Sequence, residues 1–367
     1  MNAAASSFPD PDVIYDVAII GAGPAGLSAG LNLVRAKRGV VVIDSNRPRH
    51  AATMLSHGFL TRDATPPGEL RKLAREEYLS YPEANYLLGE VLSVEELEEA
   101  PVVEQSVPGH SFGTVGLFKV STRGINGNLD TEIRARAVLV CTGLKETLPK
   151  LPSIRSFYGM GLFSCVQCDG YEYADKPIAL IGDTDDLAWR AMLIAQWSSQ
   201  LVVFTNGADV ISQGQETLLA ERGVRIERRK IVDVEGGREG PTGIRVLTGT
   251  GSEAGANEDA ESANHGVDAT SEGMESASEI VPITGGFVRP HWSAQAAFLD
   301  GFDLERDGWG LLKVDNAGRT SHAGIYAAGD VTSPGPQQLI VAAGAGAKAA
   351  ATINRDLIGV PTASTRH

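Results

Sequence analysis

The run Gly21-Ala22-Gly23-Pro24-Ala25-Gly26 decides the fold of this chain. It has the spacing G-x-G-x-x-G, follows a short apolar strand at 17–20 and opens a stretch with helical spacing at 27–36. In such a turn Gly21 permits the tight bend, Gly23 lets backbone N–H groups approach a pyrophosphate, and Gly26 lets helix and strand pack closely. We expect Asp44, at the end of the next apolar strand, to accept hydrogen bonds from an adenosine ribose. The run therefore predicts a dinucleotide-binding βαβ unit.

A second βαβ pattern occurs in the middle of the chain. It starts with an apolar strand at 178–181, continues through a helix at 187–197 and reaches a strand at 201–204. Between the two patterns, a helix at 69–81 precedes weaker strand signals within 87–140, which predict a small antiparallel sheet. The sequence thus predicts a second nucleotide-type domain.

The C-terminal part returns to the first domain. A strand at 324–328 precedes an Ala/Gly-rich helix at 339–353 that must pack closely on a neighbour. We therefore predict an α/β fold with two Rossmann-like, three-layer ββα nucleotide-binding domains, the second inserted in the first. The first domain is expected over 1–148 and 286–367, and the inserted domain over 149–285.

Residues 247–279 break this pattern. The stretch has eight acidic residues, no Lys or Arg and few large apolar residues. Such a composition does not bury enough surface to offset the entropy of ordering. We expect a flexible acidic surface insertion.

Composition and charge limit the partners. The chain has 367 residues, 43% of them hydrophobic, and a formal net charge of -14. This is enough apolar mass for two cored domains, and the negative charge disfavours nucleic acid and anionic membranes. The uncharged run at 17–34 contains Pro24 and several glycines, which indicates a strand, turn and helix rather than a membrane span. The acidic N-terminus, with Asp10 and Asp12, has no export signal, so we expect a cytoplasmic protein.

Cys165 and Cys168 form a C-x-x-C pair. Two thiols at this spacing can close a small disulfide ring and carry reversible two-electron chemistry. A zinc site would need two further ligands, and neither a second C-x-x-C nor an H-x-x-x-H pair is present, so we expect no metal. The third cysteine, Cys141, ends an apolar run and is expected to be buried.

The segment Gly324-Ile325-Tyr326-Ala327-Ala328-Gly329-Asp330 decides which dinucleotide is bound. It resembles the second flavin motif of the pyridine nucleotide-disulfide oxidoreductases, in which the aspartate bonds the ribityl chain or its phosphate. Thr142-Gly143 would supply the short middle motif of that family. The resemblance implies FAD, held by Gly329, Asp330, Thr142 and Gly143 together with the first glycine run.

The order of these motifs, with Cys165-Val166-Gln167-Cys168-Asp169-Gly170 in the inserted domain, resembles the low-molecular-weight thioredoxin reductases. The resemblance implies that Cys165 meets the substrate, Cys168 faces the flavin and Asp169 is the acid/base for the thiolate. It also implies a flavin contact at Gln338, an adenine contact through the backbone of Val91, and a homodimer.

The second glycine turn departs from that family. Where an NADPH-using reductase has G-x-G-x-x-G/A, this chain has Gly182-Asp183-Thr184-Asp185-Asp186-Leu187, with three carboxylates at a helix start. No Lys or Arg occurs between Ala191 and Glu221 to bind a 2′-phosphate. Both features disfavour NADPH, and the alternative is an unusual loop that still binds it weakly.

Several stretches, among them Ser56-His57-Gly58-Phe59-Leu60-Thr61-Arg62-Asp63, resemble the branch that includes the gliotoxin and holomycin dithiol oxidases. The resemblance implies oxidation of a small dithiol, with electrons passed to O2. Asp169 departs from that branch, where a histidine is usual. His57 is a candidate base, and the alternative for a single loop histidine is a structural or solvated role.

These observations predict an FAD-dependent thiol-disulfide oxidoreductase that oxidises a dithiol with O2 and does not use NADPH efficiently. Its substrate is expected to be a small dithiol or a thioredoxin-like protein. One alternative is a thioredoxin reductase fed by NADPH or ferredoxin. The other is a non-catalytic, redox-sensing flavoprotein, against which the retained cysteine pair and Asp169 argue.

Overall fold

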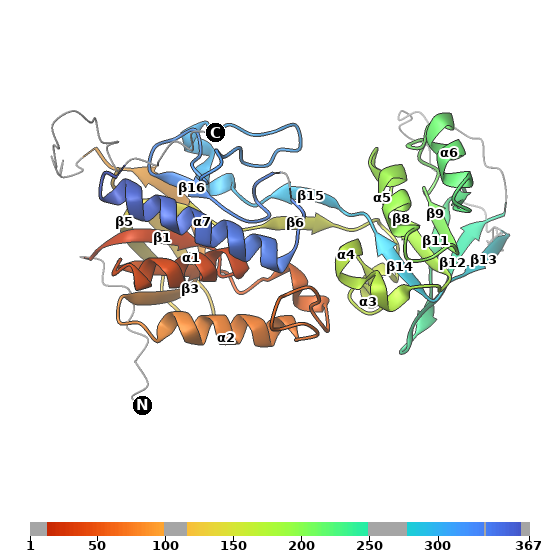
Figure 1. Ribbon diagram of the computed structural model, residues 1–367, viewed down its shortest axis with the longest axis horizontal. Coiled ribbons are helices and arrows are strands. Elements are labelled where there is room, and N and C mark those ends of the chain that lie inside the picture. The colour runs from red at the N-terminus through yellow and green to blue at the C-terminus, as the bar shows by residue number, and fades with distance from the viewer. Residues whose placement is uncertain (1–12, 99–115, 249–276, 334, 361–367) are drawn as a thin grey trace, which may run out of the picture. The chain divides into compact units, whose positions relative to one another are not determined.

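The computed structural model describes residues 13–98, 116–248, 277–333 and 335–360 (Figure 1). The chain divides into two compact units. Unit 1 comprises Met1–Thr147 and Trp292–His367, and unit 2 comprises Leu148–His291. Among the residues described, no helix has the length and apolar character needed to cross a membrane.

Unit 1 is built on a parallel sheet with the strand order β3-β2-β1-β5-β16. The long strands β3 and β5 continue past this sheet and pair antiparallel with β4. The antiparallel sheet predicted from the sequence is therefore formed largely by strands that the main sheet also uses. The strands are β1 (Ile14–Ile20), β2 (Val40–Asp44), β3 (Ala84–Glu96), β4 (Phe118–Gly124), β5 (Thr131–Val140) and β16 (Ile325–Ala327).

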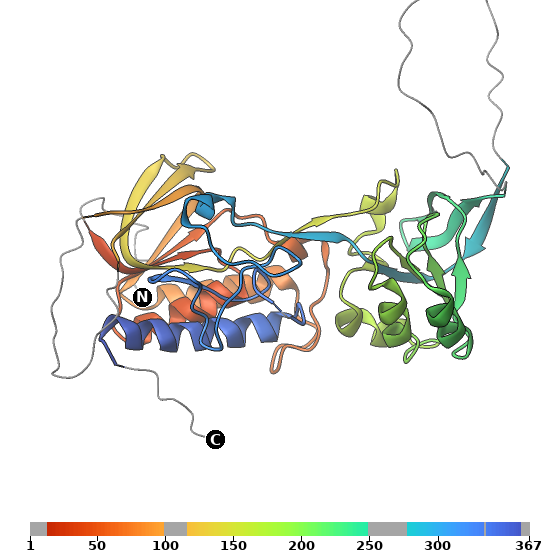
Figure 2. The ribbon, with the colours of Figure 1, turned by 90° about the horizontal axis from the view of Figure 1, so that it is seen from above.

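Three helices cover the other face of the parallel sheet, opposite the antiparallel strands (Figure 2). They are α1 (Pro24–Arg35), α2 (Pro67–Leu79) and α7 (Leu339–Leu357). Helix α1 begins three residues before the predicted start, because Pro24 at its first position already has a helical φ and Gly23 is the N-cap. Helix α7 packs tightly on α1, since a Cβ on Gly346 would lie 2.0 Å from the carbonyl oxygen of Ala25.

Unit 2 repeats the three-layer plan. Its parallel sheet has the order β10-β9-β8-β14-β7, and a three-stranded antiparallel sheet, β11-β12-β13, packs against one face. Helices pack on the other face. The strands are β7 (Leu162–Phe163), β8 (Ile178–Ile181), β9 (Leu201–Phe204), β10 (Arg225–Glu227), β11 (Ile231–Gly237), β12 (Gly240–Leu247), β13 (Ser278–Pro282) and β14 (Gly285–Val288). The helices on that other face are α4 (Val166–Asp169), α5 (Leu187–Ile194) and α6 (Gln213–Ala220), whereas α3 (Ile154–Phe157) packs on the face of the antiparallel sheet; a 3-10 turn lies at Tyr171–Tyr173.

The predicted α/β class with Rossmann-like units is confirmed. The sequence places the return to the first domain at 286, but the structure places it at Trp292, because β14 pairs with β7 and β8 of unit 2. The chain passes between the units through β6 (Leu144–Thr147) and β15 (His291–Ala294), which form a two-stranded sheet. The predicted insertion at 247–279 lies outside the described residues except at its two ends. There Leu247 is the last residue of β12, and Ser278 and Glu279 begin β13, so these three residues are in paired strands and not in a flexible segment.

Candidate active site

A cavity of about 590 Å³ lies within unit 1, at the carboxyl ends of β1 and β2. It brings together residues from both ends of the chain. Residues predicted to bind the cofactor line its wall: Gly21, Gly23, Pro24, Ala25, Asp44, Val91, Thr142, Gly143, Gly329, Asp330 and Gln338. The remaining predicted residue, Gly26, does not line the cavity but packs against Gly21 of the turn.

The first glycine run has the geometry of a phosphate-binding turn. Gly21 has a φ of +110°, and a Cβ there would lie 2.4 Å from the carbonyl oxygen of Cys141. A Cβ on Gly26 would lie 1.9 Å from the carbonyl oxygen of Gly21, whereas nothing lies within 4 Å of one on Gly23. Gly23 is the N-cap of α1 and no side chain caps this helix. The first N–H groups of α1 therefore remain available to an anion at the cavity.

Thr142-Gly143, which follows β5 next to Gly21, also fits a polar ligand. The hydroxyl of Thr142 is buried and has no hydrogen-bond partner among the residues that the structure describes. Gly143 has a φ of +66° and open space at its Cβ position. A buried hydroxyl without a partner is costly, so a ligand that bonds it would remove that cost. This part of the cavity wall therefore suits a ligand with polar groups, such as a dinucleotide.

Asp44 is buried at the end of β2, with its carboxylate engaged by protein donors. Its Oδ1 accepts from the backbone N–H of Asn46 at 2.8 Å, and its Oδ2 accepts from Arg71 and from the hydroxyl of Tyr86. A carboxylate offers about four acceptor positions, so Asp44 retains capacity for a ribose hydroxyl. Arg71, from α2, also lines the cavity, and sequence reasoning did not find it.

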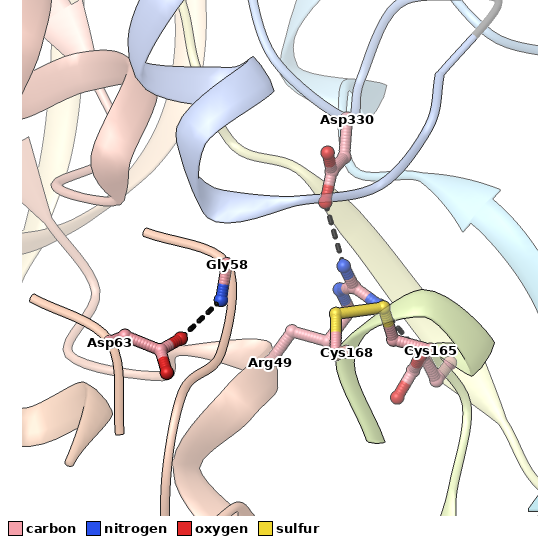
Figure 3. The surroundings of a disulfide bond; sticks show 7 residues. Arg49, Gly58, Asp63, Cys165, Cys168 and Asp330 are labelled. Carbon is pink, nitrogen blue, oxygen red and sulfur yellow. Dashed lines mark hydrogen bonds and ion pairs between the residues drawn. A yellow bond between two sulfur atoms is a disulfide. The ribbon is translucent and has the colours of Figure 1, made fainter. Parts of the chain in front are cut away.

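Asp330 lies on the cavity wall in contact with Arg49 (Figure 3). The Arg49 guanidinium donates to Asp330 Oδ2 at 2.7 Å and to Glu146 Oε1 at 2.9 Å. Burial raises the pKa of Asp330 above its ordinary value, Arg49 opposes this rise, and Glu146 adds to it. Arg49 is a second residue that the sequence did not reveal, because its partners lie 97 and 281 residues away.

The cysteine pair lies in unit 2, where Cys165 caps the short helix α4 and Cys168 lies within it. The two cysteines form a disulfide with a Cα–Cα distance of 5.3 Å (Figure 3). Asp169 follows directly and is only 8% exposed. Burial raises its pKa to about 7, with a contribution from the carboxylate of Glu172. A carboxyl group beside the disulfide can thus gain or lose a proton near neutral pH.

Two further residues singled out in the sequence are His57 and Cys141. His57, in unit 1, is not among the residues that line the cavity; its Nδ1 lies 3.7 Å from Asp63 Oδ1, which also accepts from the Gly58 N–H at 2.8 Å. Cys141 is buried on the cavity wall, and burial raises the pKa of its thiol. A thiol that does not ionise is a poor nucleophile, which agrees with the structural role predicted for Cys141.

The turn at 182–187 in unit 2 is filled by its own side chains. Asp186 Oδ2 lies 2.9 Å from both the Arg190 and the Arg289 Nε atoms, and its Oδ1 accepts from the Thr184 hydroxyl at 2.6 Å. Burial raises the pKa of Asp186, but Thr184 and the two arginines outweigh burial and hold the pKa low. Leu187 is buried over Gly182, since a Cβ on Gly182 would lie 2.7 Å from its Cδ1.

These contacts correct the electrostatic argument made from the sequence. The sequence predicts that three carboxylates at this helix start disfavour NADPH, but Asp186 is neutralised by arginine, and Asp183 Oδ1 lies 2.9 Å from His291 Nε2. Of the two cations that pair with Asp186, Arg190 on α5 is only four residues away, a spacing that the sequence does show. Arg289, just after β14, is 103 residues away, and no local sequence pattern indicates it. The main difference between this turn and the one at 21–26 is therefore that side chains fill the space beside its backbone. The difference in charge is smaller than the sequence suggests.

The model of one protein family, described as pyridine nucleotide-disulphide oxidoreductase, matches residues 15–346. The chain belongs to this family. A thioredoxin reductase of Aquifex aeolicus is 25% identical to this oxidoreductase and is aligned over 97% of each chain. The crystal structure of TrxB from Bacillus anthracis, assigned to the thioredoxin reductases, has 30% identity and a TM-score of 0.75, covering 94% of this chain and 98% of that one. The crystal structure of HlmI has 29% identity and a TM-score of 0.76, covering 94% and 93%.

Membership in this family, together with the cavity, identifies the type of enzyme and its cofactor. The oxidoreductase is a flavoprotein of thioredoxin reductase type, and its cofactor is FAD. The residues of the unit 1 cavity fit that cofactor, because a phosphate-binding turn, a carboxyl group and a buried hydroxyl that has no partner among the described residues all line one cavity. The predicted family and cofactor are confirmed.

Proposed function

We propose that this flavoprotein oxidises a dithiol substrate to a disulfide with O2 as the final acceptor, and that it uses NADPH poorly. The observation that carries the proposal is the turn at 182–187. Where the turn at 21–26 leaves open space at Gly23, the equivalent position in unit 2 is Thr184, whose hydroxyl is bonded to Asp186. A pyrophosphate needs close approach to backbone N–H groups, and the side chains of Thr184, Asp186 and Leu187 reduce that approach.

The cysteine pair would carry the exchange. A substrate thiolate attacks the Sγ of Cys165, the Cys165–Cys168 bond breaks and Cys168 leaves as a thiolate. The second substrate thiolate then attacks the substrate sulfur of the mixed disulfide and releases Cys165. The substrate leaves as a disulfide, and its electron pair remains on the enzyme dithiol. Bound FAD would supply the acceptor for this pair and the path to O2, which takes up the electrons with two protons as H2O2.

Asp169 would manage the protons of this exchange. Because its pKa lies near 7, it can accept a proton from an attacking thiol and return one to a leaving thiolate at cellular pH. Its position next to Cys168 in sequence and its low exposure support this role. We propose Cys165, Cys168 and Asp169 as the reacting groups. His57 remains a weaker proposal, since its imidazole does not line the cofactor cavity.

A reductase supplied by NADPH is the second candidate, favoured by the names of the relatives. Its substrate would be a thioredoxin-like protein, and the same thiol steps would run in reverse. The experiment that separates the two is oxygen uptake with a small dithiol such as dithiothreitol. The proposed oxidase consumes one O2 and forms one H2O2 for each disulfide. Negligible oxygen uptake, together with NADPH-dependent reduction of thioredoxin, would overturn the proposal.

A further inference from the structure

A cluster of charged and polar side chains extends from the cofactor cavity to the strands that connect the two units. Arg49 and Asp330 belong to the cavity wall, whereas Glu146 and Trp292 do not line it. Glu146 lies on β6 and Trp292 on β15. The Trp292 Nε1–H donates to Glu146 Oε1 at 3.2 Å, the same oxygen that accepts from Arg49 at 2.9 Å.

The guanidinium of Arg49 is divided between two acids. Its Nη1 donates a hydrogen bond to Glu146 and its Nη2 donates one to Asp330. The planar guanidinium therefore holds both carboxylates in fixed positions. The side chains of Glu146, Asp330 and Arg49 are only 9%, 17% and 23% exposed. Low exposure weakens screening by water and makes these contacts stronger than surface ion pairs.

We propose that Arg49 is a positioning residue for FAD. It holds the carboxylate of Asp330 in place at the cavity wall, and Glu146, itself bonded by Trp292, holds Arg49. Since Glu146 and Trp292 lie on the connecting strands, cofactor affinity is coupled to the structure of β6 and β15. The inference goes beyond the proposed function, because it holds for either electron donor and either direction of reaction.

The test is the dissociation constant of FAD, measured from flavin fluorescence after dilution of the full-length holoenzyme. Arg49→Met should weaken FAD binding by about tenfold or more, as expected when a charge-assisted hydrogen bond is lost. Glu146→Gln should weaken it by several fold although Glu146 does not line the cavity. The double variant should bind FAD no more weakly than Arg49→Met alone, because Glu146 acts through Arg49. Glu305→Gln is the control: it breaks an exposed ion pair with Lys313 in the same unit and should change nothing.

Two further variants keep the test decisive. Arg49→Lys retains the charge but lacks the fork, so it should remain weaker than the wild type. Trp292→Phe keeps a ring and removes one N–H donor, so it should weaken FAD binding by about threefold even if Glu146→Gln fails to fold. Any of three results would overturn the proposal. The first is wild-type affinity for FAD in both Glu146→Gln and Trp292→Phe. The others are strictly additive losses of affinity in the double variant and wild-type affinity in Arg49→Lys.

Discussion

Replacement of Asp169 by Asn should stabilise the oxidised protein at pH 8 and impair its turnover. The pKa of Asp169 rises from 3.8 to about 7 on folding, mainly through burial. One pKa unit corresponds to about 1.4 kcal/mol, so ionising this carboxyl in the folded protein costs up to about 4 kcal/mol. Asn has nearly the same shape and never ionises, so it avoids this cost.

The sign of the pH dependence follows from proton binding. Between pH 4 and pH 7 the folded protein keeps the Asp169 proton that the unfolded chain has lost, so wild-type stability falls as pH rises through this window and then levels. The stability gained by Asp169→Asn should therefore be small near pH 4, increase up to about pH 7 and stay constant above it. Denaturant unfolding followed by circular dichroism at several pH values measures this difference.

The Asp169 experiment needs a control substitution and a measurement of turnover. Asp175→Asn changes an exposed aspartate of the same unit and should leave the stability difference near zero at every pH. Turnover of Asp169→Asn should fall by roughly 100-fold, as for loss of a general acid/base. Two results would refute the claim that Asp169 is a buried carboxyl group that exchanges a proton during turnover. One is a stability change that is the same at pH 5 and pH 8, and the other is undiminished turnover of Asp169→Asn.

Three further outcomes are expected. Gly26→Ala should abolish FAD retention, measured by absorbance of the purified protein, because the added methyl would lie 1.9 Å from the Gly21 carbonyl oxygen. Gly68→Ala is the matched control: its added methyl has no described atom within 4 Å, so this variant should keep its bound flavin and its yellow colour. Cys168→Ser should block electron transfer to the flavin, whereas reduced Cys165→Ser should show a long-wavelength absorption band from a Cys168 thiolate; a band confined to Cys168→Ser would reverse the two roles. Replacing residues 249–276 by an Asn-Gly turn should leave flavin content and turnover nearly unchanged, because Leu247 and Ser278 already lie opposite each other in the β12–β13 ladder, and a large loss of turnover would show that the segment supports the site.

The sequence predicted those features of the fold and the cavity that depend on local backbone requirements. The run Gly21 to Gly26, Thr142-Gly143 and Gly329-Asp330 each need particular residues at fixed spacing, and the structure brings all three segments to one cavity. Element ends were less predictable: α5 ends at Ile194 rather than Trp197, because the chain turns there instead of completing the apolar pattern.

Charge pairing across the chain could not be predicted. Arg49 contacts acids at positions 146 and 330, and Arg289 neutralises Asp186 from 103 residues away. No periodicity links such positions, because these contacts form only when the parallel strands of each unit bring their carboxyl ends together. For the same reason, the acidic residues at 183–186 suggest a stronger repulsion of a bound pyrophosphate than the folded protein would exert, because the sequence does not show that Arg289 pairs with Asp186.

The most direct test of the proposed oxidase is anaerobic reduction of the bound flavin, followed by its absorbance. Dithiothreitol should bleach the flavin through Cys165 and Cys168, and admitted air should restore the colour with formation of H2O2. NADPH or NADH should bleach it far more slowly, because the turn at 182–187 is filled by Thr184, Asp186 and Leu187. Bleaching by reduced ferredoxin alone would instead favour a ferredoxin-fed reductase. Rapid, stoichiometric bleaching by micromolar NADPH would contradict the oxidase and show a conventional reductase with an unusual turn.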